Sequence, residues 1–273
     1  MGRTRSMSGR FLALAIGASL LAAACGGSAS AAPTLAPGET ATPPPTAAPG
    51  TTAGPDSSVG LPDGALAFGA ATSSLDALDS YEFGVEIAST TTTAGVETKS
   101  RTVMTGVVVN RPDKASSLQM DEYDESGTVS STTGIIIIGD ASWVRSDTSG
   151  PWESIPLAQA SLFAQTFAAF RPEKLFGVYF ATLGNDFTNA GTETKNGVPS
   201  THYKGGEGIG SVFAAIAQFQ GTWTSDVWLA TDGDYLVHSE AAGQGTSAGD
   251  TGSFLMTVDI TKPNAAEPIE APR

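Results

Sequence analysis

The chain has 273 residues and a formal net charge of −14, from 28 acidic and 14 basic side chains. This negative balance repels nucleic acids and anionic lipid headgroups, so neither is expected to bind through a basic surface. Two histidines and one cysteine are too few for a soft-metal site or a disulfide framework. Only carboxylate sites of the calcium type remain, and the acidic stretches at 121–125 and at Asp232 and Asp234 are more simply a solvated loop and a turn. No metal or cofactor is expected.

The first 24 residues have the pattern of a secretory signal peptide. Arg3, Arg5 and Arg10 form a positive beginning, and the 14 residues from Phe11 to Ala24 are all apolar or small. That length suits a signal peptide and is short of the roughly 20 residues that span a bilayer. We therefore expect the protein to be exported. No later segment is long and apolar enough to span a membrane.

The only cysteine follows directly, in the sequence Leu-Ala-Ala-Ala-Cys at 21–25. This segment resembles the lipobox of bacterial lipoproteins, although Ala22 stands where leucine is commoner. The resemblance implies that Cys25 becomes the new N-terminus and carries a diacylglycerol group. Because two acyl chains anchor a protein stably, the chain would sit on the extracytoplasmic face of a membrane of the cell envelope. The alternative is an ordinary signal peptide that leaves a stray thiol. Loss of the three signal arginines takes the net charge from −14 to −17.

Residues 25–60 read as the acylated cysteine followed by a tether. Gly26 to Gly60 consists almost entirely of Pro, Thr, Ala, Gly and Ser. Such a composition buries too little apolar surface to offset chain entropy, so a disordered spacer is expected. Its Thr-Pro content leaves O-glycosylation open.

Residues 61–273 have the length of one β-rich domain. Leu66, Ala70, Leu75 and Leu78 have helical spacing and predict a helix that ends near Ser80. From Tyr81 the period changes to two, which predicts a half-buried strand. Further strands are expected within residues 100–110, 114–123, 128–138, 141–146, 186–205, 225–240 and 252–261.

Short turn sequences join these strands and predict an antiparallel sheet. Residues 111–113 and Gly139-Asp140 mark tight connections, and Asn196-Gly197 is the strongest hairpin signal in the chain. Asp232-Gly233 is a second two-residue hairpin signal of the same kind. The two histidines, His202 and His238, fall in strand patterns and are expected to be side chains on the sheet. Parallel strands would need long crossovers, which are absent between these pairs.

Helical stripes interrupt the strands at two places. The stretch 155–184 has helix starts at Pro156 and Pro172, and the stretch 208–221 is bounded by glycines. The stripes are apolar and aromatic, so they must lie against an apolar surface, naturally one face of the sheet. Their residues are Leu157, Ala160, Phe163, Phe167, Phe170, Leu175, Phe176, Tyr179 and Phe180 in the first stretch, and Val212, Phe213, Ile216 and Phe219 in the second. Segregated strands and helices predict an α+β fold.

The order of segments resembles the LppX/LprG-type envelope lipoproteins, whose fold is related to the LolA and LolB lipoprotein carriers. The segments that carry the resemblance are "GVVVNRPDKASSLQM", "GDASWVRSDTSGPWESIP", "NGVPSTHYKGG", "VWLATDGDYLVHSEAAGQG" and "TVDITKPNAAEPIEAP". It implies a strongly curved antiparallel sheet, a half-barrel, with helices packed on its concave face around an apolar cavity. The ligand would be a lipid or another hydrophobic molecule, and we expect a monomer. Its cavity residues would be Phe163, Phe167, Phe170, Leu175, Phe176, Phe180, Val212, Phe213 and Ile216.

Two alternatives stay open at this point. Aromatic stripes at helical spacing are more often ordinary core packing than the lining of a cavity, and the domain could be a non-carrier interaction module displayed on a flexible stalk. An enzyme is not expected. Residues 245–249 match G-x-S-x-G, but the motif needs a strand before it, a helix after it and a histidine later in the chain. Here both histidines come earlier, so a polar hairpin loop explains the match, and we predict no catalytic residues.

Overall fold

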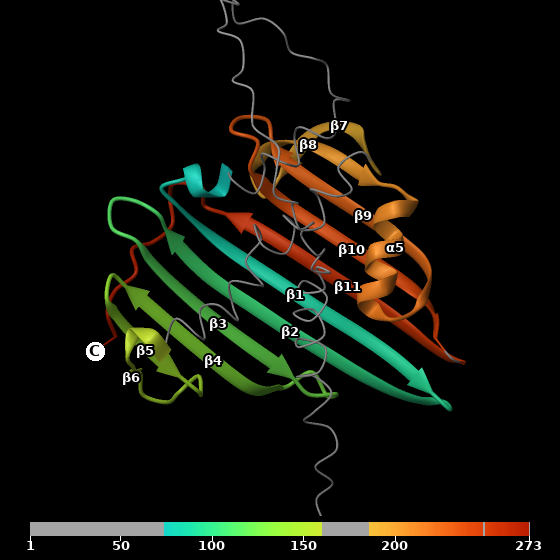
Figure 1. Cartoon of the computed structure of the whole chain (residues 1–273), viewed down its shortest axis with the longest axis horizontal. Helices are drawn as coiled ribbons and strands as arrows, with labels where there is room; N and C mark the ends of the chain where they lie inside the picture. Colours follow the sequence, from blue (N-terminus) through green and yellow to red (C-terminus); the bar gives the residue numbers. More distant parts are fainter. Residues whose placement is uncertain (1–73, 160–185, 248, 273) are drawn as a thin grey trace, which may run out of the picture. The chain divides into compact units, whose positions relative to one another are not determined.

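The computed structural model describes residues 74–159, 186–247 and 249–272, all of which belong to one compact unit, Gly60–Arg273. Eleven antiparallel strands form a single curved, open sheet (Figure 1). Their order across the sheet is β6-β5-β4-β3-β2-β1-β11-β10-β9-β8-β7. Their bounds are β1 Ser80–Thr93, β2 Val96–Val109, β3 Ala115–Tyr123, β4 Val129–Ile138, β5 Ala141–Arg145, β6 Glu153–Ser154, β7 Phe187–Lys195, β8 Val198–Gly205, β9 Gln220–Ala230, β10 Leu236–Ser247 and β11 Asp250–Thr261.

The sheet consists of two meanders joined by their longest strands. β1 to β6 run outward to one edge, and β11 back to β7 run outward to the other. β1 and β11, which lie far apart in the sequence, pair in the middle of the sheet, with Val85 opposite Val258. β6 and β7 are consecutive in the sequence and form the two opposite edges. The antiparallel sheet predicted from the turn signals is thus confirmed, and the pairing of β1 with β11 unites its halves.

Alternating residues give the sheet two chemically different faces. On β1, Tyr81, Phe83 and Val85 are almost fully buried, whereas Glu82 and Glu86 point the other way. The strand registers extend this division across the sheet, placing Met104 of β2 and Val258 of β11 level with Val85. We call the surface that carries Tyr81, Phe83 and Val85 the core face, and the surface that carries Glu82 and Glu86 the opposite face.

The β7–β8 hairpin has the predicted turn at Asn196-Gly197. Both residues have positive φ, 51° and 78°, as a two-residue turn of this kind requires. The β9–β10 turn is wider than the two-residue turn predicted at Asp232-Gly233. Ala230 N donates a hydrogen bond to Tyr235 O, so four residues lie in the turn, and positive φ occurs at Gly233 and Asp234.

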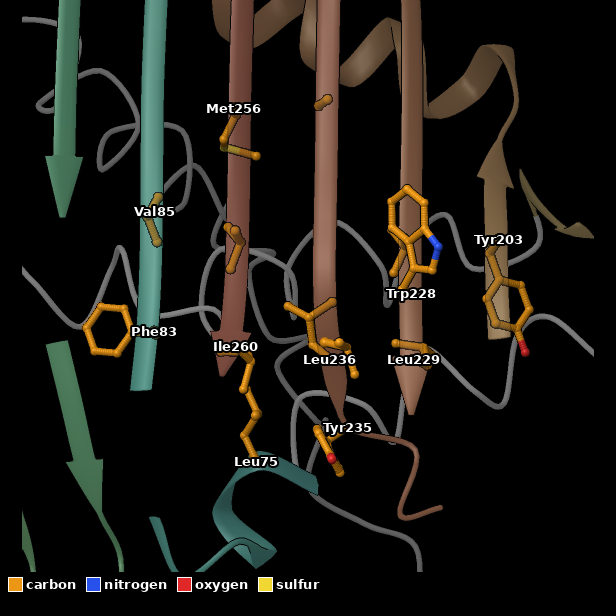
Figure 2. Packing of buried hydrophobic residues seen from close by; sticks show 14 of the residues in the cluster. Leu75, Phe83, Val85, Tyr203, Trp228, Leu229, Tyr235, Leu236, Met256 and Ile260 are labelled. Atoms are coloured by element: carbon orange, nitrogen blue, oxygen red, sulfur yellow. The ribbon is translucent and has the colours of Figure 1, made fainter. Parts of the chain in front are cut away.

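The predicted N-terminal helix is described only from residue 74 onward, where it is short. The 3-10 helix η1 spans Leu75–Ala77, and β1 begins at Ser80. Asn110 Nδ2 donates hydrogen bonds to the carbonyl oxygens of Leu75 and Leu78, which holds η1 at the end of the sheet. The buried side chain of Leu75 lies beyond the end of β11, below Ile260 (Figure 2). Leu66 and Ala70 lie outside the described residues.

The helix predicted within 208–221 is present as α5, Glu207–Ala217, and it packs on the core face against β9 (Figure 1). Asp186 holds its first turn: the carboxylate accepts a hydrogen bond from Ile209 N at 2.6 Å, and the backbone oxygen accepts one from Gly206 N. Gln218, at φ 61°, adopts the left-handed conformation and ends the helix. The placement of Phe219 on the helical stripe was therefore wrong, because this residue lies between α5 and β9.

Of the other predicted helical stretch, only the beginning is described. Gln159 N donates a hydrogen bond to Pro156 O, which is the first turn expected at Pro156. Leu157 is exposed, whereas Ala160 and Tyr179, like the rest of that stripe, lie outside the described residues. In the described part of the chain, no helix is both long and apolar enough to cross a bilayer.

Candidate functional site

The residues predicted to line a cavity are only partly described. Val212 is half-buried on α5, and Phe213 is 2% exposed on the same helix. Ile216 belongs to α5. The lipidation residue Cys25 lies outside the described residues, as do Phe163, Phe167, Phe170, Leu175, Phe176 and Phe180. A cavity on the core face therefore stays a prediction, and the described residues show the surface against which it would lie.

Phe213 belongs to an aromatic cluster between α5 and the sheet. Its ring lies 6.1 Å from that of Trp223 in β9, centroid to centroid. Phe219 lies 5.1 Å from Trp223 on a nearly parallel plane, and Phe254 of β11 lies 5.8 Å from it. Phe213 is thus packed against protein in this region, and the four rings cover one end of the core face.

Glycines on the sheet make room for these rings. A Cβ atom on Gly243 would lie 2.5 Å from the ring of Trp223, and one on Gly245 would lie 2.8 Å from Phe219. The rings therefore rest directly on the backbone of β10. The Nε1 atom of Trp223 is buried without a hydrogen-bond partner among the described residues, and leaving such a donor unpaired costs about 1–3 kcal/mol. The rings around it make this end of the core face apolar.

Part of the apolar surface beside this cluster is still accessible. Ile87 of β1 and Leu118 and Met120 of β3 pack against the core cluster but are only half-buried. They adjoin fully buried neighbours, since Met120 is opposite Met104 in the β2–β3 register. The core face thus presents partly covered apolar side chains next to its packed centre.

The opposite face carries a polar row that runs across the strands. Each residue of this row is the register partner of the next on the neighbouring strand. We call it the cross-strand row; from β8 to β5 it consists of His202, Trp228, His238, Asp259, Gly84, Thr105, Gln119, Gly134 and Arg145. Both predicted sheet histidines are in it, which confirms their placement.

Trp228 is the centre of one end of the row. The ring of His202 stacks on it at 4.2 Å, that of His238 meets it edge-on at 5.0 Å, and the ammonium of Lys195 lies 4.3 Å above it. Trp228 Nε1 donates a hydrogen bond to Glu193 Oε1. The indole is 8% exposed, although it lies on the face away from the core.

A carboxylate holds each histidine of this cluster. Asp226 lies 2.7 Å from His202 Nε2, and Asp259 lies 2.7 Å from His238 Nδ1. Burial acts to raise the pKa of Asp259, but the hydrogen bonds from His238 and Asn196 and the nearby charges of His238 and Lys195 outweigh it. The pKa of Asp259 is therefore below its ordinary value.

Two open hollows lie over the opposite face, one on each side of β1. The first, of about 610 Å³, contains small and uncharged side chains. These include Ala88, Thr90, Thr224, Ala242, Gln244, Ser253 and Leu255. The second, of about 590 Å³, lies over the middle of the cross-strand row, between Asp259 and Arg145, with Gly84 in its floor and the indole of Trp152 in its wall.

The acidic candidates from the sequence do not assemble into a metal site in the described ranges. No group of three or more His, Cys, Asp or Glu side chains there is arranged to hold a metal ion. Asp121 accepts hydrogen bonds from Gln119 and Thr132, and Asp232 and Asp234 are in the β9–β10 turn. The G-x-S-x-G match lies in the β10–β11 hairpin, as expected, since Ser247 pairs with Asp250.

Comparison with known proteins gives similarities of fold at low sequence identity. No family model matches the chain, and a search of curated proteins found no match. Among solved structures, LprF from Mycobacterium bovis is 10% identical with a TM-score of 0.44; the match covers 78% of this chain and 98% of that one. The lipoprotein LppX from Mycobacterium tuberculosis is 18% identical with a TM-score of 0.39, and the match covers 77% of this chain and 98% of LppX. The LolA superfamily protein NE2245 from Nitrosomonas europaea is 11% identical with a TM-score of 0.19, and the match covers 72% of this chain and 93% of NE2245.

LppX and the LolA superfamily, which the order of segments resembles, are thus among the solved structures of similar fold. At such identities and TM-scores these similarities carry no information on a ligand or on any residue of this chain.

Proposed function

We propose that the protein is a membrane-anchored extracytoplasmic lipoprotein that binds a lipid or another hydrophobic ligand on the core face of its sheet, for transport or sensing in the envelope. One observation carries the proposal: Ile87, Leu118 and Met120 remain half-buried on that face, directly beside the packed core. A ligand alkyl chain that covered them would be stabilised by about 25 cal/mol for each Å² of apolar surface removed from water.

The chemistry of the neighbouring core supports an apolar ligand over a polar one. The indole N–H of Trp223 has no hydrogen-bond partner among the described residues, and the rings around it and the half-buried Ile87, Leu118 and Met120 are aromatic or aliphatic. A polar ligand would lose its hydrogen bonds to water there and find few replacements. The proposed cavity would extend this surface to Phe163, Phe167, Phe170, Leu175, Phe176 and Phe180.

We also propose that Cys25 carries the anchor. The residue is the only cysteine and ends an apolar run that resembles a lipobox. The full chain should incorporate radiolabelled fatty acid and partition into detergent, and Cys25→Ser should do neither. Labelling that persists in Cys25→Ser would contradict this assignment.

Ligand binding is tested on the Cys25→Ser chain, which lacks the acylation site. We expect native mass spectrometry to find co-purifying lipid, and a fluorescent fatty acid to bind competitively with it. Met120→Glu places a charge on the half-buried part of the core face and should weaken fatty-acid binding about tenfold or more. Val96→Glu adds the same charge at a residue that is 67% exposed and should leave binding unchanged.

Thermal unfolding of both variants separates loss of binding from loss of the fold. A chain that never carries lipid, and that binds no added fatty acid while folded, would leave the interaction module as the better description. Equal binding by Met120→Glu and Val96→Glu would place the ligand somewhere other than the core face.

A further inference from the structure

The second hollow of the opposite face has an unusual charge arrangement. Three of its lining side chains are charged: Glu82, Asp259 and Arg145. Glu82 is paired with Lys262 at 2.9 Å, and Asp259 accepts hydrogen bonds from His238 and Asn196. Arg145 has no carboxylate within 4.0 Å among the described residues. Its guanidinium is thus the one lining charge that lacks a charged partner there.

Arg145 is nevertheless held in a defined position. Its Nη2 donates a hydrogen bond to Gln119 Oε1 at 3.1 Å, across Gly134, and its guanidinium carbon lies 4.7 Å above the ring of Trp152. Trp152 in turn rests on Gly134, where a Cβ atom would lie 2.9 Å from the ring. The absence of a side chain at Gly134 therefore lets both groups lie over β4.

Gln119, which accepts the hydrogen bond from Arg145, is itself held by a second hydrogen bond through its side-chain nitrogen. Gln119 Nε2 donates a hydrogen bond to Asp121 Oδ2 at 2.9 Å, and Thr132 donates one to Asp121 Oδ1 at 2.6 Å. These hydrogen bonds orient the side-chain amide of Gln119 so that its oxygen faces Arg145. Asp121 is engaged by these two donors and is linked to the guanidinium by hydrogen bonds through Gln119.

The donors of Arg145 that a ligand can reach are those of its Nη atoms. The bond to Gln119 is the only hydrogen bond of the guanidinium within the described residues, and Nε, which also has no partner there, is fully buried. Asp147 is a carboxylate close enough to feel the charge of Arg145. Hydrogen bonds from Ser149 and Thr148 and the charge of Arg145 lower its pKa, but its Oδ1 already accepts from Ser149 and it makes no ion pair. An oriented guanidinium with free donors in a hollow is suited to an oxyanion.

We propose that this hollow is a second binding site, in which Arg145 and Trp152 take the phosphate-type oxyanion group of a small molecule or of a lipid headgroup. The site is on the face away from the core and is independent of the proposed apolar ligand site. The indole of Trp152 supplies an apolar wall beside the charged group. The net charge of −14 disfavours an anion at long range, so the binding energy at this site would have to come from the short-range contacts with Arg145 and Trp152.

The test uses the Cys25→Ser chain and follows the side-chain N–H signals of Trp152 and Arg145 by NMR. Two probes are titrated at constant ionic strength against sodium chloride: inorganic phosphate, and short-chain phosphatidylglycerol below its micelle concentration. Arg145→Gln should weaken binding at least tenfold, because it removes the charge and the fork of donors. Arg145→Lys keeps the charge but loses the fork of donors, so its affinity should lie between those of Arg145→Gln and the parent chain.

Arg101→Gln is the matched control. Arg101 is on the opposite face as well, and its guanidinium lies 4.3 Å from the ring of Tyr123, but it is paired with Glu86 at 2.8 Å. This variant should bind the probes within twofold of the unmodified chain. If Arg145→Gln does not fold, the loss in Arg145→Lys relative to Arg101→Gln decides the question.

The two probes distinguish the sources of the oxyanion. Binding of inorganic phosphate that depends on Arg145 indicates a small soluble ligand, and binding of phosphatidylglycerol alone indicates a lipid headgroup. The proposal is overturned if neither probe binds in excess of chloride, or if Arg145 variants bind as Arg101→Gln does. Fatty-acid binding to the core face should be the same in Arg145→Gln and in the parent chain, so the two proposals fail separately.

Discussion

The two faces of the sheet use the same strands for opposite purposes. On the core face, aromatic rings fill the space above glycines, as Trp223 does over Gly243 and Phe219 over Gly245. On the opposite face, Gly84 has nothing within 4 Å of its missing side chain and forms the floor of a hollow. Gly243 and Gly245 thus admit close packing partners and Gly84 leaves space, although Gly134 on the opposite face also carries a ring, that of Trp152.

The polar groups of the two faces also differ in how they are satisfied. In the core cluster, Trp223 Nε1 has no hydrogen-bond partner among the described residues, whereas on the opposite face the Nε1 of Trp228 is bonded to Glu193. The opposite face also has unpartnered buried atoms, Nε of Arg145 and Nε2 of His238, but there they lie among other polar and charged side chains, whereas Trp223 lies among aromatic rings. Substitutions placed at matched positions on the two faces should show this difference as a difference in stability.

The largest effect is expected at the contact between α5 and the sheet. Phe213→Ala removes a ring that is 2% exposed and packed against Trp223, and it should lower the free energy of unfolding by about 3–5 kcal/mol. Val212→Ala, on the same helix but half-buried, should cost clearly less. Urea unfolding measures both. Equal costs would mean that α5 is not held by its aromatic contact.

Glycine substitutions compare the two faces directly. Gly243→Ala brings a Cβ atom to 2.5 Å from the Trp223 ring, and the displacement should cost about 1–3 kcal/mol. Gly84→Ala meets open space and should be neutral, or stabilising by up to about 1 kcal/mol, because it reduces the entropy of the unfolded chain. Both variants are compared by urea unfolding and near-UV circular dichroism of the tryptophans. Similar losses at both positions would contradict the division between the faces.

The faces themselves could be predicted from the sequence, because strand alternation is local. Tyr81, Phe83 and Val85 alternate with Glu82 and Glu86, and the structure places the two sets on opposite sides. The glycine-bounded pattern at 208–221 likewise predicted α5. Its end was missed because the left-handed conformation of Gln218 has no strong sequence signal. Phe219 therefore joined the aromatic cluster from outside the helix.

The cross-strand row could not have been predicted in the same way. Its members come from nine strands, and their alignment depends on all eight registers between β8 and β5. The pairing of β1 with β11 joins residues about 175 positions apart, as Gly84 and Asp259 are, and no turn signal specifies it. The histidines were correctly assigned to strands, but their common partner Trp228 and the position of Arg145 follow only from these registers.

A smaller effect on the free energy of unfolding is expected when the pH is lowered, and it comes from Asp259 on the opposite face. The pKa of Asp259 is lowered in the folded protein, since the hydrogen bonds from His238 and Asn196 outweigh burial. Its contribution to stability is therefore present above the pKa of the unfolded chain and is lost as the pH falls through the lower folded pKa. Asp259→Asn should flatten the loss of unfolding free energy as the pH falls below about 4, the ordinary pKa of an aspartate. An unchanged slope would show that the contacts of Asp259 are equally favourable when it is protonated.

The smallest effect on the free energy of unfolding is expected at an exposed ion pair near the end of the sheet. The ammonium of Lys99 lies 3.0 Å from Glu97 near the β1–β2 hairpin, and both side chains are more than half exposed. Water screens such a pair, and holding two long side chains together costs entropy, so Lys99→Ala should change the free energy of unfolding by less than about 0.5 kcal/mol. The same assay gives the comparison with Phe213→Ala. A loss above 1 kcal/mol at Lys99 would mean that the exposed end of β2 is stabilised by charge rather than by its strand pairing with β1.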